Sequence, residues 1–254
     1  MLNGLYTATS GMLALNRKIE IISNNLANIN TTSYKREDAV FTNYLYKDER
    51  NPQGLIRQSE YNKTINNTVS LHSVFTDFES GNLMHTGNKL DLALETKNTF
   101  FAVETPFGIR FTRDGHFTLD KDRRLVNKDG FPVLSRNYEN NEGIILPDGD
   151  ITITEKGEIL VNGAIVDQLF IAEVDDPSKM QKMGRNLYAA IGFVPDESES
   201  PVVKQGFLEG SNVNPVKEMV AIIDAMRGFE TYQKVIQTID EINSRTSNDI
   251  GRLA

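Results

Sequence analysis

Hydrophobic residues in the first thirty positions of the chain follow one another in alternating steps of three and four. This spacing keeps one apolar seam on a helix over about seven turns, which is typical of a coiled-coil strand. A helix with so narrow a stripe has to bury it against at least one partner helix. The seam consists of Leu5, Ala8, Met12, Leu15, Ile19, Ile22, Leu26 and Ile29.

The helical period returns near the other end of the chain. Asn214 suits an N-cap, and Pro215 fits the first helical position, where its missing N–H is not needed. The spacing therefore predicts a second long helix over 214–248, which is the natural partner for the first. Its apolar positions step by three and four and then drift around the helix: Met219, Ile222, Met226, Phe229, Tyr232, Ile236, Ile239 and Ile242.

Between the two helical patterns, from 68 to 205, short apolar runs are separated by turn residues at close spacing, which indicates antiparallel β structure. The sequence at 105–108 (Thr-Pro-Phe-Gly) suits a type I turn. Asp114-Gly115 and Asn162-Gly163 predict hairpins, because both residue types tolerate positive φ. The middle of the chain is therefore expected to be an all-β domain.

These patterns predict an α+β fold, in which long N- and C-terminal helices form a coiled-coil-like core domain with an inserted all-β domain. We expect the N-terminal helix within 1–34 and an extended connector over 35–67, with a short helical piece around 40–46. The β-rich outer domain follows over 68–205, and the C-terminal helix lies within 206–254.

Composition narrows the classes of function. The net charge of -8 argues against nucleic-acid binding, because phosphate binding needs clustered Lys and Arg. The chain has no Cys, which excludes disulfides and thiolate metal sites. No stretch approaches the length of a transmembrane helix, and the first thirty residues lack the uninterrupted apolar core of a signal peptide. We therefore expect no membrane insertion and no cleaved signal.

Candidate catalytic and metal-binding motifs are weak. The segment 120–124 begins like a calcium loop, but Leu125 stands at the glycine position and Phe131 where a Glu is required, so we expect a β-turn with solvated charges. Nucleotide-binding and nucleophile-elbow motifs are missing from the sequence, and so is Trp, which commonly lines sugar sites. We predict no catalytic residue, no metal and no cofactor, and hence no enzyme. The three histidines, which also lack zinc-type spacing, are His72, His85 and His116.

Four asparagines crowd the end of the first helix despite their low helix propensity. They form either a frayed polar terminus or a set of amides that hydrogen-bond to packed neighbours, where a neutral donor and acceptor suits an interface. Both interpretations fit the composition. The residues are Asn24, Asn25, Asn28 and Asn30.

Several of these segments resemble the bacterial flagellar rod and hook proteins. SNNLANINTTSYKR at 23–36 is similar to their N-terminal signature, and GLYTATSGMLA at 4–14 to their opening turns. The stretches 78–94 and 100–134, with TGNKLDLA and TRDGHF, resemble the β region, and 208–241 the C-terminal helix. Two positions depart from the family pattern. Ser33 replaces a usual glycine, and 95–99 replaces a glycine-rich approach to Phe100, so these turns have residues that reach positive φ less freely than glycine.

The resemblance implies a subunit of the hollow axial rod that joins the flagellar motor to the hook. Such proteins are exported through the flagellar type III apparatus without a cleaved signal peptide, and the rod crosses the periplasm. Their partners would be copies of the chain, other rod and hook proteins, the export apparatus and the ring around the rod. The length fits both the proximal and the distal rod proteins and is short for a hook subunit, with a slight preference for proximal.

On this reading the functional residues are interface residues. Two rivals remain: a soluble or secreted binding module whose β domain recognises a saccharide or protein and whose helices only dimerise it, and a hydrolase using acidic residues of the β domain. A closed dimer without filaments would favour the first rival, and a pocket with converging carboxylates the second. The predicted assembly-interface residues are Leu5, Met12, Leu15, Ile19, Ile22, Asn24, Asn25, Leu26, Asn28, Met219, Ile222, Met226, Phe229 and Ile236.

Overall fold

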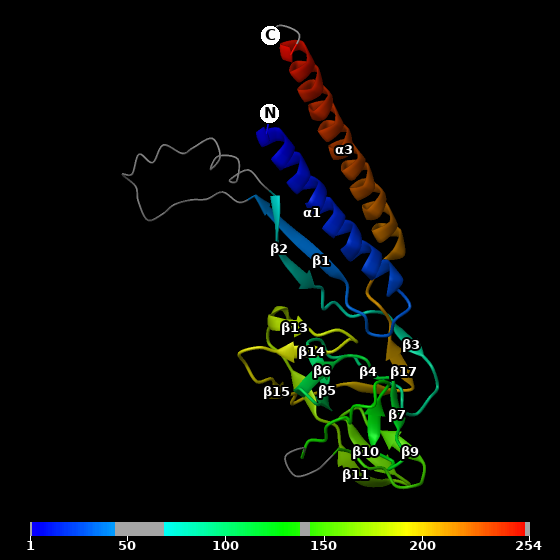
Figure 1. The fold of residues 1–254 in the computed structure, drawn as a ribbon. Helices are drawn as coiled ribbons and strands as arrows, with labels where there is room; N and C mark the ends of the chain where they lie inside the picture. Colours follow the sequence, from blue (N-terminus) through cyan, green and yellow to red (C-terminus); the bar gives the residue numbers. More distant parts are fainter. Residues whose placement is uncertain (1, 44–68, 138–142, 252–254) are drawn as a thin grey trace. The chain divides into compact units, whose positions relative to one another are not determined.

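A computed structural model describes residues 2–43, 69–137 and 143–251 (Figure 1). Contacts divide the chain into two compact units. The helical unit comprises Met1–Ala27, Glu37–Phe75 and Asn214–Ala254, and the β unit comprises Asn28–Arg36 and Thr76–Val213. Residues 28–34 and 206–213, which the sequence-based division assigns to the terminal helices, thus belong to the β unit.

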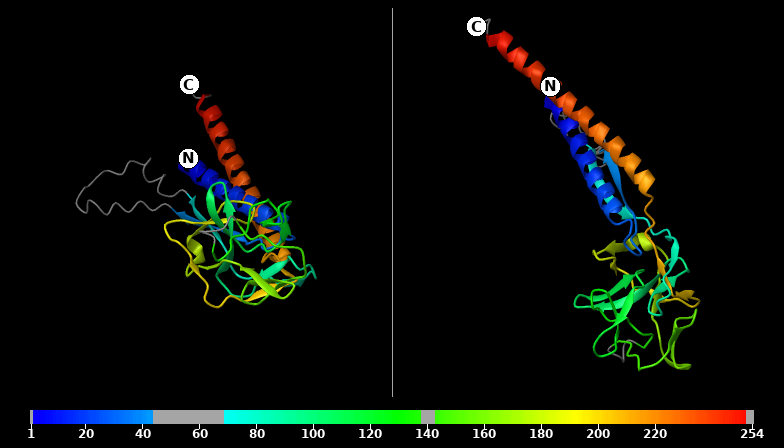
Figure 2. Two further views of the ribbon diagram at one scale, coloured as in Figure 1. Left: turned by 90° about the horizontal axis from the view of Figure 1, so that it is seen from below. Right: turned by 90° about the vertical axis from the view of Figure 1, so that its right-hand side faces the viewer.

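The helical unit is built on two long helices that lie side by side and antiparallel (Figures 1 and 2). Helix α1 spans Leu2–Ala27 and α3 spans Pro215–Gly251. The Asn214 side chain accepts hydrogen bonds from the backbone N–H groups of Val216 (3.1 Å) and Lys217 (3.2 Å), so it caps α3 as predicted. The α+β fold with a helix at each end is confirmed.

A small sheet in the helical unit corrects one prediction. Strand β1 (Glu37–Asn43) pairs with β2 (Val69–Thr76) and packs against α1. The expected helical piece around 40–46 is therefore wrong over 40–43, where Val, Phe and Thr favour the pleated surface that α1 covers. Residues 44–46 lie outside the described residues.

The β unit consists of short antiparallel strands. Its largest sheet has the order β13-β14-β6-β5-β12-β15, and smaller sheets have the orders β11-β10-β9, β16-β4, β17-β3 and β7-β8. In the described residues, its strands and a 3-10 helix are β3 (Leu83–His85), β4 (Leu92–Leu94), β5 (Thr99–Thr105), β6 (Gly108–Thr112), β7 (Phe117–Leu119), β8 (Leu125–Asn127), β9 (Ile151–Ile153), β10 (Glu158–Val161), β11 (Ala164–Gln168), β12 (Ile171–Glu173), η1 (Pro177–Lys179), β13 (Met180–Lys182), β14 (Tyr188–Ala190), β15 (Asp196–Glu197), β16 (Val203–Gln205) and β17 (Phe207–Glu209).

Strand β5 lies at the centre of the β unit and is buried on both faces. Phe101 and Val103 point into the larger hydrophobic cluster, while Phe100 and Ala102 point into the smaller one. All four side chains are fully buried. Because successive side chains of a strand face opposite sides, one apolar run of four residues supplies both cores.

Two of the three predicted turns are confirmed, and one is wrong. Hairpins join β5 to β6 at 105–108 and β10 to β11 at Asn162 (φ 53°) and Gly163 (φ 83°). Asp114-Gly115 does not form a hairpin, because β6 pairs with β5 and β14 whereas β7 pairs with β8. A Cβ on Gly115 would lie 1.8 Å from the Leu92 carbonyl oxygen. Glycine is needed there for a close backbone crossing between two sheets.

Candidate assembly surfaces

Two glycines bring α1 and α3 into close contact. A Cβ on Gly11 would lie 2.6 Å from the Tyr232 ring, and a Cβ on Gly228 would lie 2.8 Å from a Leu15 methyl group. Each glycine thus accommodates a large side chain of the facing helix. Residues nearer the end of α1 contact residues nearer the start of α3, so the two helices pair in one antiparallel register.

Asn25 joins the end of α1 to its neighbours in the helical unit. Its amide nitrogen donates to the Glu37 carbonyl (2.8 Å), and its oxygen accepts the Glu37 N–H (2.9 Å). The same nitrogen lies 3.4 Å from the Glu218 carboxylate on α3. Asn25 and Glu218 are both buried. For Asn25, the amide therefore bonds to packed neighbours, as one of the two interpretations expects.

The other asparagines of the cluster lie differently. Asn24 and Asn30 are exposed, while Asn28 is half-buried and accepts a hydrogen bond from the Thr31 hydroxyl (3.1 Å). Helix α1 ends at Ala27, so Asn28 and Asn30 lie in the following turn. Asn25 is thus the buried member of the cluster, and Asn28 and Asn30 belong to a polar turn.

The predicted interface residues of α1 lie largely on its covered side. Ile22 is buried, at 4% exposure. Five others are half-buried: Leu5, Met12, Leu15, Ile19 and Leu26. The contacts to α3 also involve Gly4, Gly11 and Asn25, one residue before Leu5, Met12 and Leu26. The α3-facing side of α1 is therefore rotated slightly from the apolar seam that the sequence indicates.

The predicted interface residues of α3 divide between two faces. Ile222, Phe229 and Ile236 are half-buried. Met219 and Met226 are each 51% exposed, whereas their neighbours Glu218 and Ala225 are buried. One residue along a helix turns the side chain by about 100°. The pattern beginning at Met219 therefore combines residues that face α1 with residues that do not.

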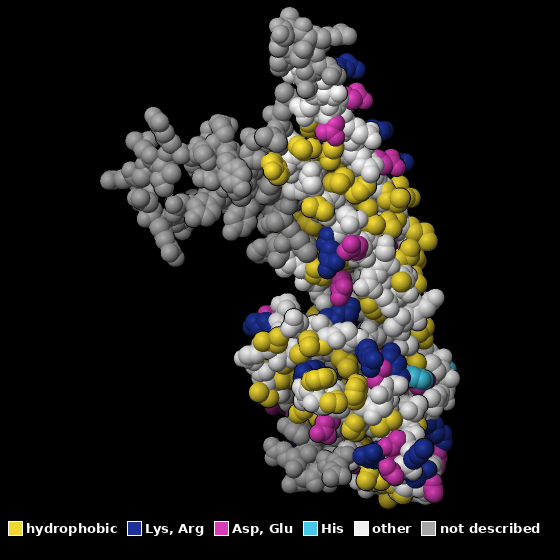
Figure 3. Space-filling view, in the orientation of Figure 1, with side chains coloured by type: hydrophobic (Ala, Val, Ile, Leu, Met, Phe, Trp, Pro, Cys, Tyr) yellow, Lys and Arg dark blue, Asp and Glu magenta, His cyan; other side chains and the backbone are white. Residues whose placement is uncertain are grey.

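An apolar stripe remains uncovered on α3. Its five side chains lie along one face over about three turns, each three or four residues from another member, on the side opposite Glu218 and Ala225. Figure 3 shows hydrophobic side chains gathered along this helix. C-terminal to the stripe the same side carries the exposed charges Arg227, Glu230 and Lys234. The outer stripe of α3 consists of Val216 (68% exposed), Met219 (51%), Val220 (54%), Ile223 (49%) and Met226 (51%).

Three charged side chains meet in the interior of the β unit. The Glu209 carboxylate accepts from Lys35 Nζ and from Arg113 Nε, both at 2.7 Å. The side chains of Lys35 and Glu209 are 0% exposed and that of Arg113 is 2% exposed. Arg113 also donates to three backbone carbonyls, those of Leu94, Thr96 and Thr99. The cluster is therefore desolvated and closely hydrogen-bonded.

The pKa values of this ion cluster reflect its burial. Burial alone would raise the pKa of Glu209, but the charges of Arg113 and Lys35 outweigh it and lower that pKa. Burial lowers the pKa of Lys35, and the charge of Glu209 only partly opposes this. The two cations thus hold Glu209 ionised in the interior.

The ion cluster joins motifs that are far apart in the sequence. Lys35 lies in the signature at 23–36, Arg113 in TRDG and Glu209 in LEGSN. Sequence reasoning missed all three residues, although each lies in a recognisable motif. The three residues are far apart in the sequence, so no local pattern predicts that they pair. Only the folded chain brings them together.

Ser33 explains one departure from the family pattern. Its φ of 53° lies in the left-handed region, where glycine is usual. The buried hydroxyl donates to the Arg113 carbonyl (2.7 Å), and the Ser33 N–H donates to the Glu209 carbonyl (2.8 Å). At the second departure, Asn98 adopts φ 59°. Both turns therefore keep glycine-like geometry without glycine.

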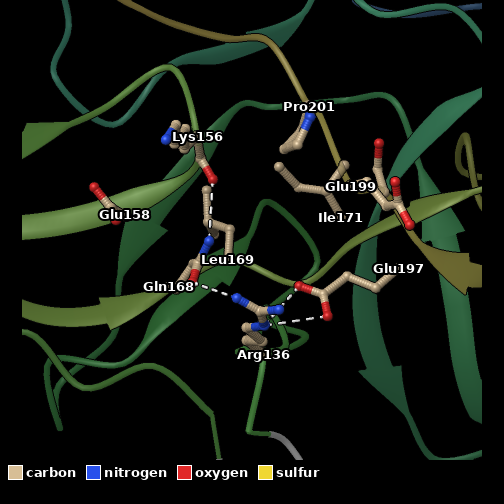
Figure 4. Close-up of a pocket in the computed structure, with 10 residues that line it drawn as sticks. Arg136, Lys156, Glu158, Gln168, Leu169, Ile171, Glu197, Glu199 and Pro201 are labelled. Atoms are coloured by element: carbon tan, nitrogen blue, oxygen red, sulfur yellow. Dashed lines mark hydrogen bonds and ion pairs between the residues drawn. The ribbon is translucent and has the colours of Figure 1, made fainter.

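The β unit also has a surface pocket of about 340 Å³, between β11, β12 and β15 (Figure 4). Arg136 spans it, bonding to Glu197 (2.9 Å) and Gln168 (3.3 Å). Glu158 lies across the pocket from Glu197, whose carboxylate turns towards Arg136. The carboxylates do not converge on one point, so this pocket gives the hydrolase alternative no support.

Residues 2–43, 69–137 and 143–251 contain neither a metal-binding cluster nor a membrane-spanning helix. No three His, Cys, Asp or Glu side chains in these ranges gather in a way that could hold a metal ion. His116 Nδ1 instead lies 3.0 Å from Asp91, and Asp120 accepts the N–H groups of Asp122 and Arg124 in the turn between β7 and β8. In the same ranges, no helix combines the length and hydrophobicity of a membrane span.

Comparison with known proteins gives consistent results along the chain. Three family models match: "Flagella basal body rod protein" over residues 5–35, "Flagellar hook protein FlgE/F/G D1 domain" over 97–161, and "Flagellar basal body rod FlgEFG protein C-terminal" over 204–249. These matches include Lys35, Arg113 and Glu209.

Similar proteins match over nearly their whole length. The flagellar basal-body rod protein FlgG of Agrobacterium fabrum is 36% identical over 98% of this chain and 100% of its own. FlgF of Caulobacter vibrioides, also a flagellar basal-body rod protein, is 32% identical over 99% of both chains. The flagellar hook-basal body complex protein FlhO of Bacillus subtilis is 30% identical over the full length of both.

Proposed function

The chain belongs to the family of flagellar basal-body rod proteins, which are structural rather than enzymatic, and we propose that it builds the rod by self-assembly through its two terminal helices. Each added subunit would bury apolar helix surface of the one before it. Such contacts are heterologous and repeat without closing, so they generate a helical polymer.

The outer stripe of α3 is the observation that supports this proposal. A surface helix normally has one apolar face, and a helix that is apolar on opposite faces lies between two layers. Helix α1 covers one face of α3 through Gly11, Leu15 and Asn25, but the face with Ile223 and Met226 is exposed in a single chain. A contiguous apolar patch on a soluble chain marks an interaction site.

The proposal also covers location and partners. The family places the chain in the basal-body rod, and we propose that the rod carries it across the periplasm between motor and hook. Copies of the chain, other flagellar rod and hook proteins, the ring around the rod and the type III export apparatus are its proposed partners. The β unit, whose apolar core is closed within one chain, would face outwards.

The test places a charge in the outer stripe. Ile223→Asp should leave the free energy of unfolding within about 0.5 kcal/mol of wild type, because the side chain is half exposed. In the polymer the same carboxylate would be buried without a partner, so assembly should be lost. Sedimentation velocity of the purified full chain over rising concentration measures both monomer and polymer.

A matched control is Gln237→Asp, which adds the same charge at an exposed position of α3 beyond the stripe. This variant should assemble like wild type. The proposal fails if Ile223→Asp assembles as well as wild type, or if wild type stops at a closed dimer.

A further inference from the structure

Helix α1 carries an apolar patch of its own, on the side away from α3. Tyr6 is 55% exposed and Leu13 is 62% exposed. They are seven residues apart, so they lie two turns apart on one face of the helix. We name this pair the α1 patch.

The α1 patch could be buried without placing a charge out of water. The chain contains no charged side chain from Met1 to Asn16. Between Tyr6 and Leu13, the Thr9 hydroxyl donates to the Leu5 carbonyl (2.8 Å) and the Ser10 hydroxyl donates to the Thr7 carbonyl (2.9 Å). A covering apolar surface would therefore leave these hydroxyls satisfied, which removes the usual penalty for burying them.

We propose that the outer stripe of α3 in one copy packs antiparallel on the α1 patch of a second copy, with Met226 beside Tyr6 and Met219 beside Leu13. This inference rests on the proposed function, because it specifies which surfaces meet when the chain assembles. Ile223 then lies over the small residues Thr9 and Ser10.

The spacing of the two surfaces supports this pairing. Met219 and Met226 are seven residues apart, as are Tyr6 and Leu13, so both pairs can meet along one line. The unbranched Met side chains adapt to an aromatic ring and to a branched neighbour. The contact ends where charges begin, at Arg17 on α1 and at Arg227 on α3.

The antiparallel direction follows from polymer geometry. Copies related by rotation and translation along one axis keep all α1 helices pointing one way and all α3 helices the other. An α1–α3 contact between such copies is therefore antiparallel, as is the contact within the chain. Within the chain Leu15 meets Gly228, so moving Leu13 to Met219 shifts the register by about eleven residues, or about 16 Å.

A second copy is the partner that these surfaces favour because the two patches differ and lie on one molecule. One copy offers a five-residue stripe of Val, Met and Ile, and the other offers an uncharged half-helix with small residues between two large ones. A contact between unlike patches leaves one of each free at the two ends of a dimer. It therefore adds copies without closing.

Disulfide cross-linking tests the register, since the chain has no cysteine of its own. The double variant Leu13→Cys/Met219→Cys should give a ladder of dimers, trimers and longer products when the assembled full chain is oxidised. A bridge within one chain is excluded, because the within-chain register separates the two positions by about 16 Å along the helices, whereas a disulfide needs about 7 Å or less between Cα atoms.

Two controls sharpen this test. A mixture of the single variants Leu13→Cys and Met219→Cys should stop at cross-linked dimers, because each chain then has one thiol. The double variant Leu13→Cys/Gln237→Cys places the second thiol beyond the outer stripe and should lose the ladder. An equal ladder from this control would overturn the proposed register.

Sedimentation of the same samples under reducing conditions separates two failures. Polymer without a Leu13–Met219 cross-link contradicts this inference and leaves the proposed function standing. Absence of polymer at every concentration contradicts both. Polymer together with the ladder supports both.

Discussion

The β unit and the helical unit differ in how completely one chain buries their side chains. In the β unit even the charged interior is complete, because Lys35, Arg113 and Glu209 satisfy one another within one chain. In the helical unit α3 buries one apolar face against α1 and leaves the other in water. The β unit therefore buries its interior within one chain, whereas the helical unit leaves an apolar face exposed, which we propose a neighbouring chain covers.

The largest predicted effect tests the completeness of the β unit. Glu209→Gln removes the one anion between two buried cations, so the free energy of unfolding should fall by about 3–5 kcal/mol. Urea unfolding followed by the near-UV signal of the β unit measures it. Glu104→Gln changes an exposed carboxylate on β5 and should have little effect. Equal stability of Glu209→Gln and wild type would show that the ion cluster does not hold the unit together.

Lowering the pH should remove the contribution of the Glu209 carboxylate to the free energy of unfolding. The pKa of Glu209 is lowered from its ordinary value of 4.5 in the folded chain, so its contribution is complete above that pH and is lost as the pH falls through the lowered value. The unfolding free energy of wild type should therefore drop below pH 4.5 more steeply than that of Glu209→Gln. Parallel curves for the two proteins would contradict this assignment.

A smaller effect is expected at the helix contact. Gly11→Leu forces a side chain against the Tyr232 ring and should cost about 1–3 kcal/mol by overpacking. Gly4→Ala is the matched control, because its Cβ would lie 3.7 Å from Ile239, an ordinary contact. That variant should gain up to about 1 kcal/mol from helix propensity. Thermal unfolding followed by far-UV circular dichroism compares them, and a tolerated Gly11→Leu would argue against the observed register.

The smallest effect separates strain from hydrogen bonding at Ser33. Ser33→Ala removes the bond to the Arg113 carbonyl but keeps the positive φ, so it should cost about 1 kcal/mol. Ser33→Gly removes the same bond and relieves the backbone, so it should be close to neutral. Chemical unfolding of the pair measures the difference. A more stable Ser33→Ala would contradict the strain.

Local patterns predicted much of this architecture. Steps of three and four located both helices, Asn214-Pro215 located the start of α3, and Asn162-Gly163 located a hairpin. The hairpin predicted at Asp114-Gly115 was wrong. Its glycine is required by the nearby Leu92 carbonyl, a contact that the neighbouring sequence does not reveal. The ion cluster and the division of α3 into two faces were missed for a similar reason. The partners of Lys35, Arg113 and Glu209 are set by tertiary structure. Met219 and Ile222 belong to the same helical pattern, and the folded chain leaves Met219 exposed and Ile222 half-buried.

Hydrogen exchange of the full chain, free and assembled, tests the central claim most directly. Amides of the β-unit core, such as those of Phe101 and Val103, should exchange equally slowly in both states. Amides of α1 over 5–27 and of α3 over 216–226 should exchange faster in the free chain at low concentration than in the polymer, because only assembly covers the outer stripe of α3. Slow exchange of both helices in the free chain, unchanged on assembly, would contradict the account.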